Sequence, residues 1–308
     1  WFATVVYLLI VEPPLYFPAV FGVDDTIGTV FAHNVFTVQF MYDRLPIYIV
    51  ALYPAVMTLA YEIVRSLGVF RDWGAVVGAV CVGFVHHCFY EIFDQLGPQL
   101  RWWAWNTDNA INHPMLASVP MSSVLLFATV GPACVALFTQ LLVTRPIERG
   151  RLLKRISLAS RTFGVAVLVP VGMAVANVPI LLAGGEHPDS AQRRAVYFVL
   201  LGAFAVVAVP ILCRQWRNSA FTPSARNPFV GIFGSAFLIV LGALWWSAMP
   251  AYFNASHGLT PDGTPTGNPI YALVCFVLAV ALTMSVTIRP GRPSAARRAQ
   301  RTRHEVMP

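Results

Sequence analysis

Two histidines and two acids lie close together near the end of a hydrophobic segment, in the run from His86 to Asp94. His87, Glu91 and Asp94 are spaced four and three residues apart, so they share one face if the segment is helical. Inside a membrane span such residues cost about 2.5–3.5 kcal/mol each near the bilayer centre. A hydrated helix end would explain them without a function. We favour a functional site, because ionisable residues within a span usually serve one.

Further polar and aromatic residues occupy the segments next to this run. His33 and Asn34 precede the second hydrophobic stretch, and a tryptophan-rich loop follows Asp94. We expect these segments to form a pocket near the outer leaflet, with an apolar floor and a lid of tryptophans. Such a pocket suits a lipid or an isoprenoid better than a soluble polar metabolite. The residues predicted to bind a substrate there are Trp102, Trp103, Trp105, Asn106, Tyr90, His33 and Asn34.

The paired carboxyls indicate general acid/base chemistry. Two acids buried near each other tend to differ in protonation, which places a proton donor beside a base. We assign these two roles to Glu91 and Asp94, and expect His86, His87 and His113 to tune or relay protons. Nearby aromatic faces could stabilise a carbocation by cation–π attraction. These features fit a membrane-bound hydratase, lyase or cyclase acting on an isoprenoid double bond.

Two other chemistries have less support from the residues. A metal site would need His87 and Glu91 with a third ligand, and no multi-histidine motif is present. We therefore predict no metal, and no cofactor is indicated. A proton path across the membrane would need Glu62, but its spacing to Arg65 predicts an ion pair within one helix instead. Glu12 stands before two prolines and is interpreted as marking a helix end.

Membrane-spanning helices must position these residues. Of the 308 residues, 57% are hydrophobic and 11% are charged, whereas about 25% charged residues are usual in soluble domains. A helix needs about 20 apolar residues to cross the bilayer core. We therefore predict an all-α integral membrane bundle of about eight transmembrane helices. The predicted spans are residues 1–22, 45–67, 73–95, 119–143, 162–182, 195–213, 229–252 and 269–288.

Basic residues orient the predicted spans. One set of alternating loops, together with the carboxyl-terminal tail, holds 17 of the 21 basic residues. The positive-inside rule makes that side cytoplasmic and places both termini there. The basic residues are almost all arginine in an alanine- and valine-rich chain. This composition indicates a multi-pass protein of a bacterial plasma membrane.

The predicted spans form a single transmembrane domain, residues 1–288, with two unlike halves. Residues 1–144 contain the polar cluster and form the functional half in this interpretation, while residues 162–288 have almost no ionisable side chain within their spans and form an apolar scaffold. Residues 289–308 are rich in arginine, alanine and proline, and are predicted to be a disordered basic cytoplasmic tail.

The stretch from Tyr90 to Ser123, about a tenth of the chain, resembles the membrane carotenoid hydratases and carotenoid cyclases. The shared features are acids at a helix end, a Gly-Pro turn, an aromatic stretch and a Val-Pro entry into the next span. In this sequence they are Glu91, Asp94, the run Leu96-Gly97-Pro98-Gln99-Leu100, Trp102, Trp103 and the run Val119-Pro120-Met121-Ser122-Ser123. The resemblance implies a small multi-span enzyme with an isoprenoid substrate.

The sequence thus predicts an enzyme that acts on a lipid or isoprenoid by acid/base chemistry in an outer-leaflet pocket. A non-enzymatic carrier of lipids or small molecules, a permease component, and a structural subunit of a membrane complex stay open as alternatives. Membrane lipids are the expected partners and no protein partner is indicated. The net charge of +7 lies in short loops between spans, where it serves orientation and lipid contact, so nucleic acid is not expected.

Overall fold

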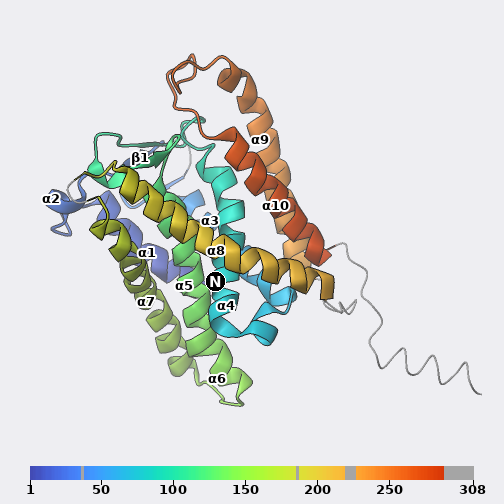
Figure 1. Ribbon diagram of the computed structural model, residues 1–308. Helices are drawn as coiled ribbons and strands as arrows, with labels where there is room; N and C mark the ends of the chain where they lie inside the picture. The colour runs from blue at the N-terminus through green and yellow to red at the C-terminus, as the bar shows by residue number, and fades with distance from the viewer. Residues whose placement is uncertain (36–37, 185–186, 219–226, 288–308) are drawn as a thin grey trace, which may run out of the picture.

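The computed structural model describes residues 1–35, 38–184, 187–218 and 227–287, which form a helical bundle (Figure 1). Seven helical segments are long and apolar enough to cross a membrane. They are α3 (Ile47–Ser66), α4 (Val69–Asp94), the segment Ser123–Glu148 that contains α5 (Gly131–Thr139) and α6 (Arg145–Glu148), α7 (Arg155–Leu182), α8 (Ala191–Asn218), the segment Val230–Phe253 that contains α9 (Ser235–Phe253), and α10 (Pro269–Thr287). The all-α bundle of a multi-pass membrane protein is therefore confirmed in its general form.

The first predicted span differs from the other seven. It forms a shorter apolar helix, α1 (Phe2–Tyr16), of 15 residues, which is about 22 Å at 1.5 Å per residue. The hydrocarbon core of a bilayer is about 30 Å thick, and α1 is not among the seven segments counted as long enough to cross it. The structure thus supports seven spans and does not confirm the eighth. The predicted basic tail, residues 289–308, lies outside the described residues.

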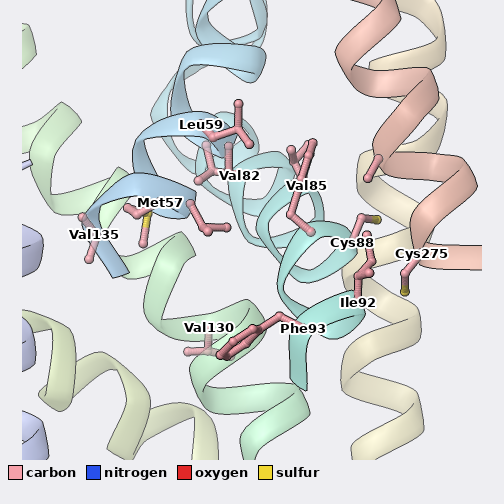
Figure 2. Packing of buried hydrophobic residues seen from close by; sticks show 14 of the residues in the cluster. Met57, Leu59, Val82, Val85, Cys88, Ile92, Phe93, Val130, Val135 and Cys275 are labelled. Atoms are coloured by element: carbon pink, nitrogen blue, oxygen red, sulfur yellow. The ribbon is translucent and has the colours of Figure 1, made fainter. Parts of the chain in front are cut away.

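Helix α4 lies at the centre of the bundle and contacts α3, α5, α8 and α10. Apolar side chains fill these contacts, as Figure 2 shows for Leu59 of α3 beside Val82 of α4. Cys88 of α4 faces α10 in the same view. Because α4 is surrounded on most sides, polar side chains on its outer half are held away from lipid and water.

Short segments at one end of the bundle connect the helices and pack on one another (upper end in Figure 1). They are α2 (Asp24–Ile27), β1 (Phe31–His33), β2 (Gln39–Phe40), β3 (Leu45–Pro46), β4 (Trp103–Trp105), the 3-10 turn Ala110–Asn112, β5 (Met115–Leu116) and β6 (Val119–Pro120). Strands β1 and β4 pair antiparallel, with His33 opposite Trp103. The guanidinium of Arg101 donates a hydrogen bond to the carbonyl of Asp262. These contacts place the loops predicted to be extracellular at one common end.

Side chains from the opposite loops meet at the other end. Glu62 forms the expected pair with Arg65, at 2.6 Å, and also accepts a hydrogen bond from the amide of Asn227. Asp72 accepts one from Gln215 at 2.8 Å. The loops therefore alternate between the two ends as charge counting predicts. Which end faces the cytoplasm stays a prediction of the positive-inside rule.

Trp245 joins α9 to α4. Its side chain is buried, and its indole N–H donates a 2.9 Å hydrogen bond to the carbonyl of Ile92. That carbonyl belongs to the last turn of α4, where helical carbonyls have no partner within the helix. Trp245 therefore fixes α9 against the end of α4, while its neighbour Trp246 is exposed.

Candidate functional site

Two carboxyls from different helices face a common internal cavity at the outer end of the bundle. The cavity has a volume of about 40 Å³, enough for two or three water molecules. Glu12 of α1 and Asp94 of α4 both line it. We call this cavity the acid chamber; its other lining residues are Leu15, Phe31, His33, Ile49, Tyr53, Tyr90, Phe93, Trp103, Trp105, Ser123 and Phe127. Most of its wall is therefore aromatic.

Glu12 lies inside α1 and is only 3% exposed, so it does not mark a helix end. Its Oε1 atom accepts a 2.6 Å hydrogen bond from the hydroxyl of Tyr53 on α3. Its Oε2 atom is buried and makes no hydrogen bond of good geometry, although the hydroxyl of Tyr16 lies near enough to interact with the carboxyl. Among the described residues, no ion pair involves Glu12, Glu91 or Asp94. A buried carboxyl with an open acceptor and no counter-ion is costly to maintain, which favours a functional explanation.

The two acids predicted to act together have different partners. Asp94 is 1% exposed and its Oδ2 accepts a 2.8 Å hydrogen bond from the hydroxyl of Ser123. Glu91 is fully buried, and its Oε2 accepts a 3.1 Å hydrogen bond from the amide of Gln95. The side chain of Gln95 in turn accepts the backbone N–H of Asn268 at the start of α10. Asp94 therefore belongs to the acid chamber, whereas Glu91 faces the contact with α10.

The paired strands β1 and β4 supply the aromatic side of the chamber. His33 stacks on Tyr16 with ring centroids 5.9 Å apart and meets Trp103 edge to face. Burial lowers the pKa of His33 to about 4, against the smaller opposing effect of a backbone hydrogen bond to Trp102, so the ring is neutral at pH 7. Its Nδ1 atom and the indole N–H groups of Trp103 and Trp105 are buried without a hydrogen-bond partner.

Gly97 permits this arrangement, because a Cβ atom at position 97 would lie about 2.1 Å from the indole ring of Trp103. Trp102 stacks on Phe93 at 5.2 Å and does not line the chamber. The amides of two further predicted ligands bind loop carbonyls: that of Asn34 donates to Arg101 and that of Asn106 to Thr29. These predicted binding residues thus hold the outer loops together.

His86 binds a helix carbonyl that lies near a proline. Ala128 belongs to the π-helical stretch η2 (Ser123–Val130), in which the N–H of Gly131 donates to the carbonyl of Leu126 five residues earlier, and in an α-helical register Pro132 would have no N–H to give to Ala128. The Nδ1 atom of His86 lies 2.8 Å from the carbonyl of Ala128 and therefore carries the proton. The ring stacks on Tyr90 and lines a second cavity of about 10 Å³ that also contains Tyr53. His86 is thus adjacent to the chamber through the two tyrosines.

His87 belongs to a separate hydrogen-bonded chain. The hydroxyl of Thr129 donates to the carbonyl of Val124, so it accepts from the Nδ1 atom of His87 at 2.8 Å. The Nε2 atom must then accept from the hydroxyl of Tyr271 on α10, at 2.5 Å. Both ring nitrogens are occupied, which argues against His87 as a metal ligand. Within the part of the chain that the structure describes, no three metal-binding side chains gather.

A second, larger pocket adjoins the acid chamber. It has a volume of about 410 Å³ and lies between α1, α7, α8 and the outer loops. We call it the lateral pocket. His113 lines it and binds the carbonyl of Thr107 at 2.8 Å, so this predicted relay residue is not in the chamber. Both spaces share the wall residues Leu15, Phe31, Trp105, Ser123 and Phe127.

Eight of the twelve predicted site residues fall into three places. Asp94, Tyr90, His33, Trp103 and Trp105 line the acid chamber. His87 and Glu91 face α10, and His113 lines the lateral pocket. Sequence reasoning missed Glu12, Tyr53 and Ser123 as members of the site. For Glu12 a signal existed, namely an acid within an otherwise apolar stretch of 15 residues.

Protein-family models, curated proteins and solved structures were each compared with this chain, and none of them matches it. The resemblance to the carotenoid enzymes gains no support from these comparisons. Function must therefore be argued from the site itself, not from ancestry.

Proposed function

We propose that the protein is a membrane enzyme that performs acid/base chemistry on an unsaturated lipid or isoprenoid in the acid chamber. One observation carries this proposal: Glu12 and Asp94, from two different helices, line one small cavity with aromatic walls. Two buried carboxyls that share a cavity without a counter-ion favour a state in which one is protonated and the other ionised. That state contains both a proton donor and a base.

The proposed reaction begins with transfer of a proton from one carboxyl to a carbon–carbon double bond. The substrate cation that forms faces the rings of Phe31, Tyr90 and Trp103, whose π-electrons stabilise positive charge. A water molecule then adds to the cation, and the second carboxylate takes the proton that this water releases. The product is an alcohol, and no external oxidant or reductant is needed. Capture by a second double bond of the substrate would give a ring instead.

The sizes of the two spaces suit this reaction. The acid chamber, at about 40 Å³, admits only the reacting end of a substrate, whereas the lateral pocket, at about 410 Å³, has room for the part next to it. Pockets of 300–1,000 Å³ are typical for small-molecule ligands. The five shared wall residues make the two spaces neighbours, so a single amphiphile would occupy both.

Deuterium incorporation tests the proposal. The purified protein would be reconstituted in phosphatidylcholine vesicles that contain polyprenols of mixed chain length, in deuterated water. The wild type should add deuterium to a double bond, and Glu12→Gln or Asp94→Asn should lower the rate at least 100-fold. Glu62→Gln is the matched control, because Glu62 binds Arg65 and Asn227 at the other end of the bundle, and it should retain the rate. Equal incorporation in all four proteins would refute acid/base work in the chamber.

A non-enzymatic lipid carrier is the second candidate, and the volume of the lateral pocket favours it. A carrier would retain lipid in the pocket without adding deuterium to it. Its lipid exchange between vesicles would continue in Glu12→Gln with altered affinity. Lipid exchange by the wild type without any deuterium incorporation would therefore replace the enzyme hypothesis with this one.

A further inference from the structure

The charge of the lateral pocket distinguishes it from the acid chamber. Arg193, in the first turn of α8, lines the lateral pocket, and the described residues that line it include no carboxylate. The acid chamber next to it has the opposite character, because its described wall residues include two carboxyls and no lysine or arginine. Polar side chains of Asn112, His113 and Asn177 also line the lateral pocket. The two adjoining spaces therefore favour ligand groups of opposite charge.

A second, independent observation points to a ligand in the lateral pocket. Asn112 is 1% exposed and its amide nitrogen donates to the carbonyls of Val30 and Asn106. Its Oδ1 atom is buried and has no hydrogen-bond partner. Leaving such an acceptor unpaired costs about 1–3 kcal/mol. A hydroxyl group on a bound molecule would satisfy it.

The remaining wall explains why the ligand should be a lipid. Leu126, Ile180 and Leu181 provide an apolar surface along η2 (Ser123–Val130) and α7. Leu181 is 63% exposed on the outside of the bundle, in a segment long and apolar enough to span the membrane. An acyl or prenyl chain that leaves the pocket along this surface would stay within the hydrocarbon. A free phosphate ion would gain nothing from these contacts.

We propose that the lateral pocket binds the phosphate group of an anionic lipid, with Arg193 as the cation that recognises it. A hydroxyl of the same headgroup would donate to Asn112, and the chain would pass over Ile180 and Leu181. This inference rests on the proposed function in one respect, namely that the reactive end of the same lipid reaches the acid chamber. The substrate class is then a phosphate-bearing unsaturated amphiphile.

Native mass spectrometry with defined lipids tests the assignment. The full chain would be taken from vesicles with equal amounts of phosphatidylglycerol and phosphatidylcholine of identical acyl chains. The wild type should retain phosphatidylglycerol about tenfold over phosphatidylcholine. Arg193→Gln should reduce that ratio to near one, and Arg193→Lys should keep most of it. The matched control is Arg194→Gln, because Arg194 is next in sequence, binds Asp189 at 3.0 Å and does not line the pocket.

Each contrary outcome overturns a defined part of the proposal. An unchanged ratio in Arg193→Gln, or an equal loss in Arg194→Gln, would show that the pocket does not recognise the headgroup. Displacement of the lipid by millimolar inorganic phosphate would assign the site to a free anion. Leu181→Trp, at an exposed position that tolerates a large side chain, should lower retention of both lipids at least threefold if the chain follows α7. Equal retention would exclude that path.

The two proposals fail separately. If Glu12→Gln abolishes deuterium incorporation while Arg193→Gln keeps the lipid ratio, the enzyme proposal stands and the headgroup assignment is wrong. If Arg193→Gln loses the ratio while no variant of the acid chamber changes any lipid, the pocket is an anionic-lipid site without acid/base chemistry.

Discussion

The hydroxyl of Tyr53 on α3 donates a 2.6 Å hydrogen bond to Glu12 on α1. This bond is the polar contact that holds the carboxyl of the shorter first helix against the bundle core. It also leaves the second oxygen of Glu12 without a hydrogen bond of good geometry. One contact therefore fixes the position of an acid while keeping half of it available.

Tyr53→Phe should destabilise the protein and impair the acid chamber together. Hydrogen bonds between membrane helices contribute about 0.6 kcal/mol on average and up to about 1.7, so we expect a loss in that range in a detergent unfolding assay. Tyr61→Phe is the matched control, since Tyr61 accepts a hydrogen bond from Gln140 away from the chamber. It should lose similar stability and keep full activity. Equal activity in both variants would mean that Tyr53 is only structural.

Gly97→Ala should displace Trp103 from the chamber wall. The new methyl group would lie about 2.1 Å from the indole ring, and such overpacking typically costs about 1–3 kcal/mol. Gly202→Ala provides the comparison, because nothing lies within 4 Å of a Cβ atom at that position of α8. It should be neutral or stabilising by up to about 1 kcal/mol. Thermal unfolding in one detergent should give a lower midpoint for Gly97→Ala than for Gly202→Ala. Equal midpoints would contradict the packing argument.

His33 should make the protein sensitive to acid. Burial holds its pKa at about 4 in the folded protein, against about 6.5 in an unfolded chain. The folded state therefore favours the neutral ring, and the stability it contributes is complete above about pH 6.5 and lost as the pH falls towards 4. The maximum effect is about 3 kcal/mol. Urea unfolding of the wild type and His33→Gln between pH 7 and 4 should show that the free energy of unfolding falls less with acid in the variant. An equal fall in both proteins would refute this.

His87 and Tyr271 should act as a unit that joins α4 to α10. Their hydrogen bond fixes the tautomer of the histidine, and replacing either side chain leaves the other without its partner. In a double-mutant cycle with His87→Gln and Tyr271→Phe, we expect a coupling energy of roughly 0.6–1.7 kcal/mol. Because neither residue lines the acid chamber, deuterium incorporation should persist in both. Additive losses of stability would exclude the bond.

Hydropathy and charge located most of the fold from the sequence, because a bilayer imposes a minimum length on each apolar helix. The seven long helices overlap predicted spans, and contacts such as those of Arg101 with Asp262 and of Glu62 with Asn227 are consistent with loops that alternate between two ends. Hydropathy and charge did not predict where the first helix ends. Its predicted span, residues 1–22, extends beyond Tyr16 into Phe17 and Pro18, where the chain leaves the helix.

The site was predicted only in part, because sequence spacing describes neighbours within one helix. It correctly placed His87, Glu91 and Asp94 on one helix, α4. It could not show that Asp94 shares a cavity with Glu12 of α1, or that Glu91 binds Gln95 beside α10. The pairing of β1 with β4 was equally hidden, since neither loop has an alternating pattern long enough to indicate a strand.

The carbonyl of Ala128 links two residues that no local pattern connects. In an α-helical register Pro132 could give that carbonyl no N–H, and His86 supplies a donor at 2.8 Å. In a homologue with a residue other than proline at position 132, the backbone N–H of that residue could donate to the carbonyl of residue 128. A histidine at position 86 would then no longer be needed as the donor. The two positions should therefore covary across related chains. A lineage that kept the histidine after losing the proline would reveal selection on the ring for another reason, such as its stacking on Tyr90 beside the acid chamber.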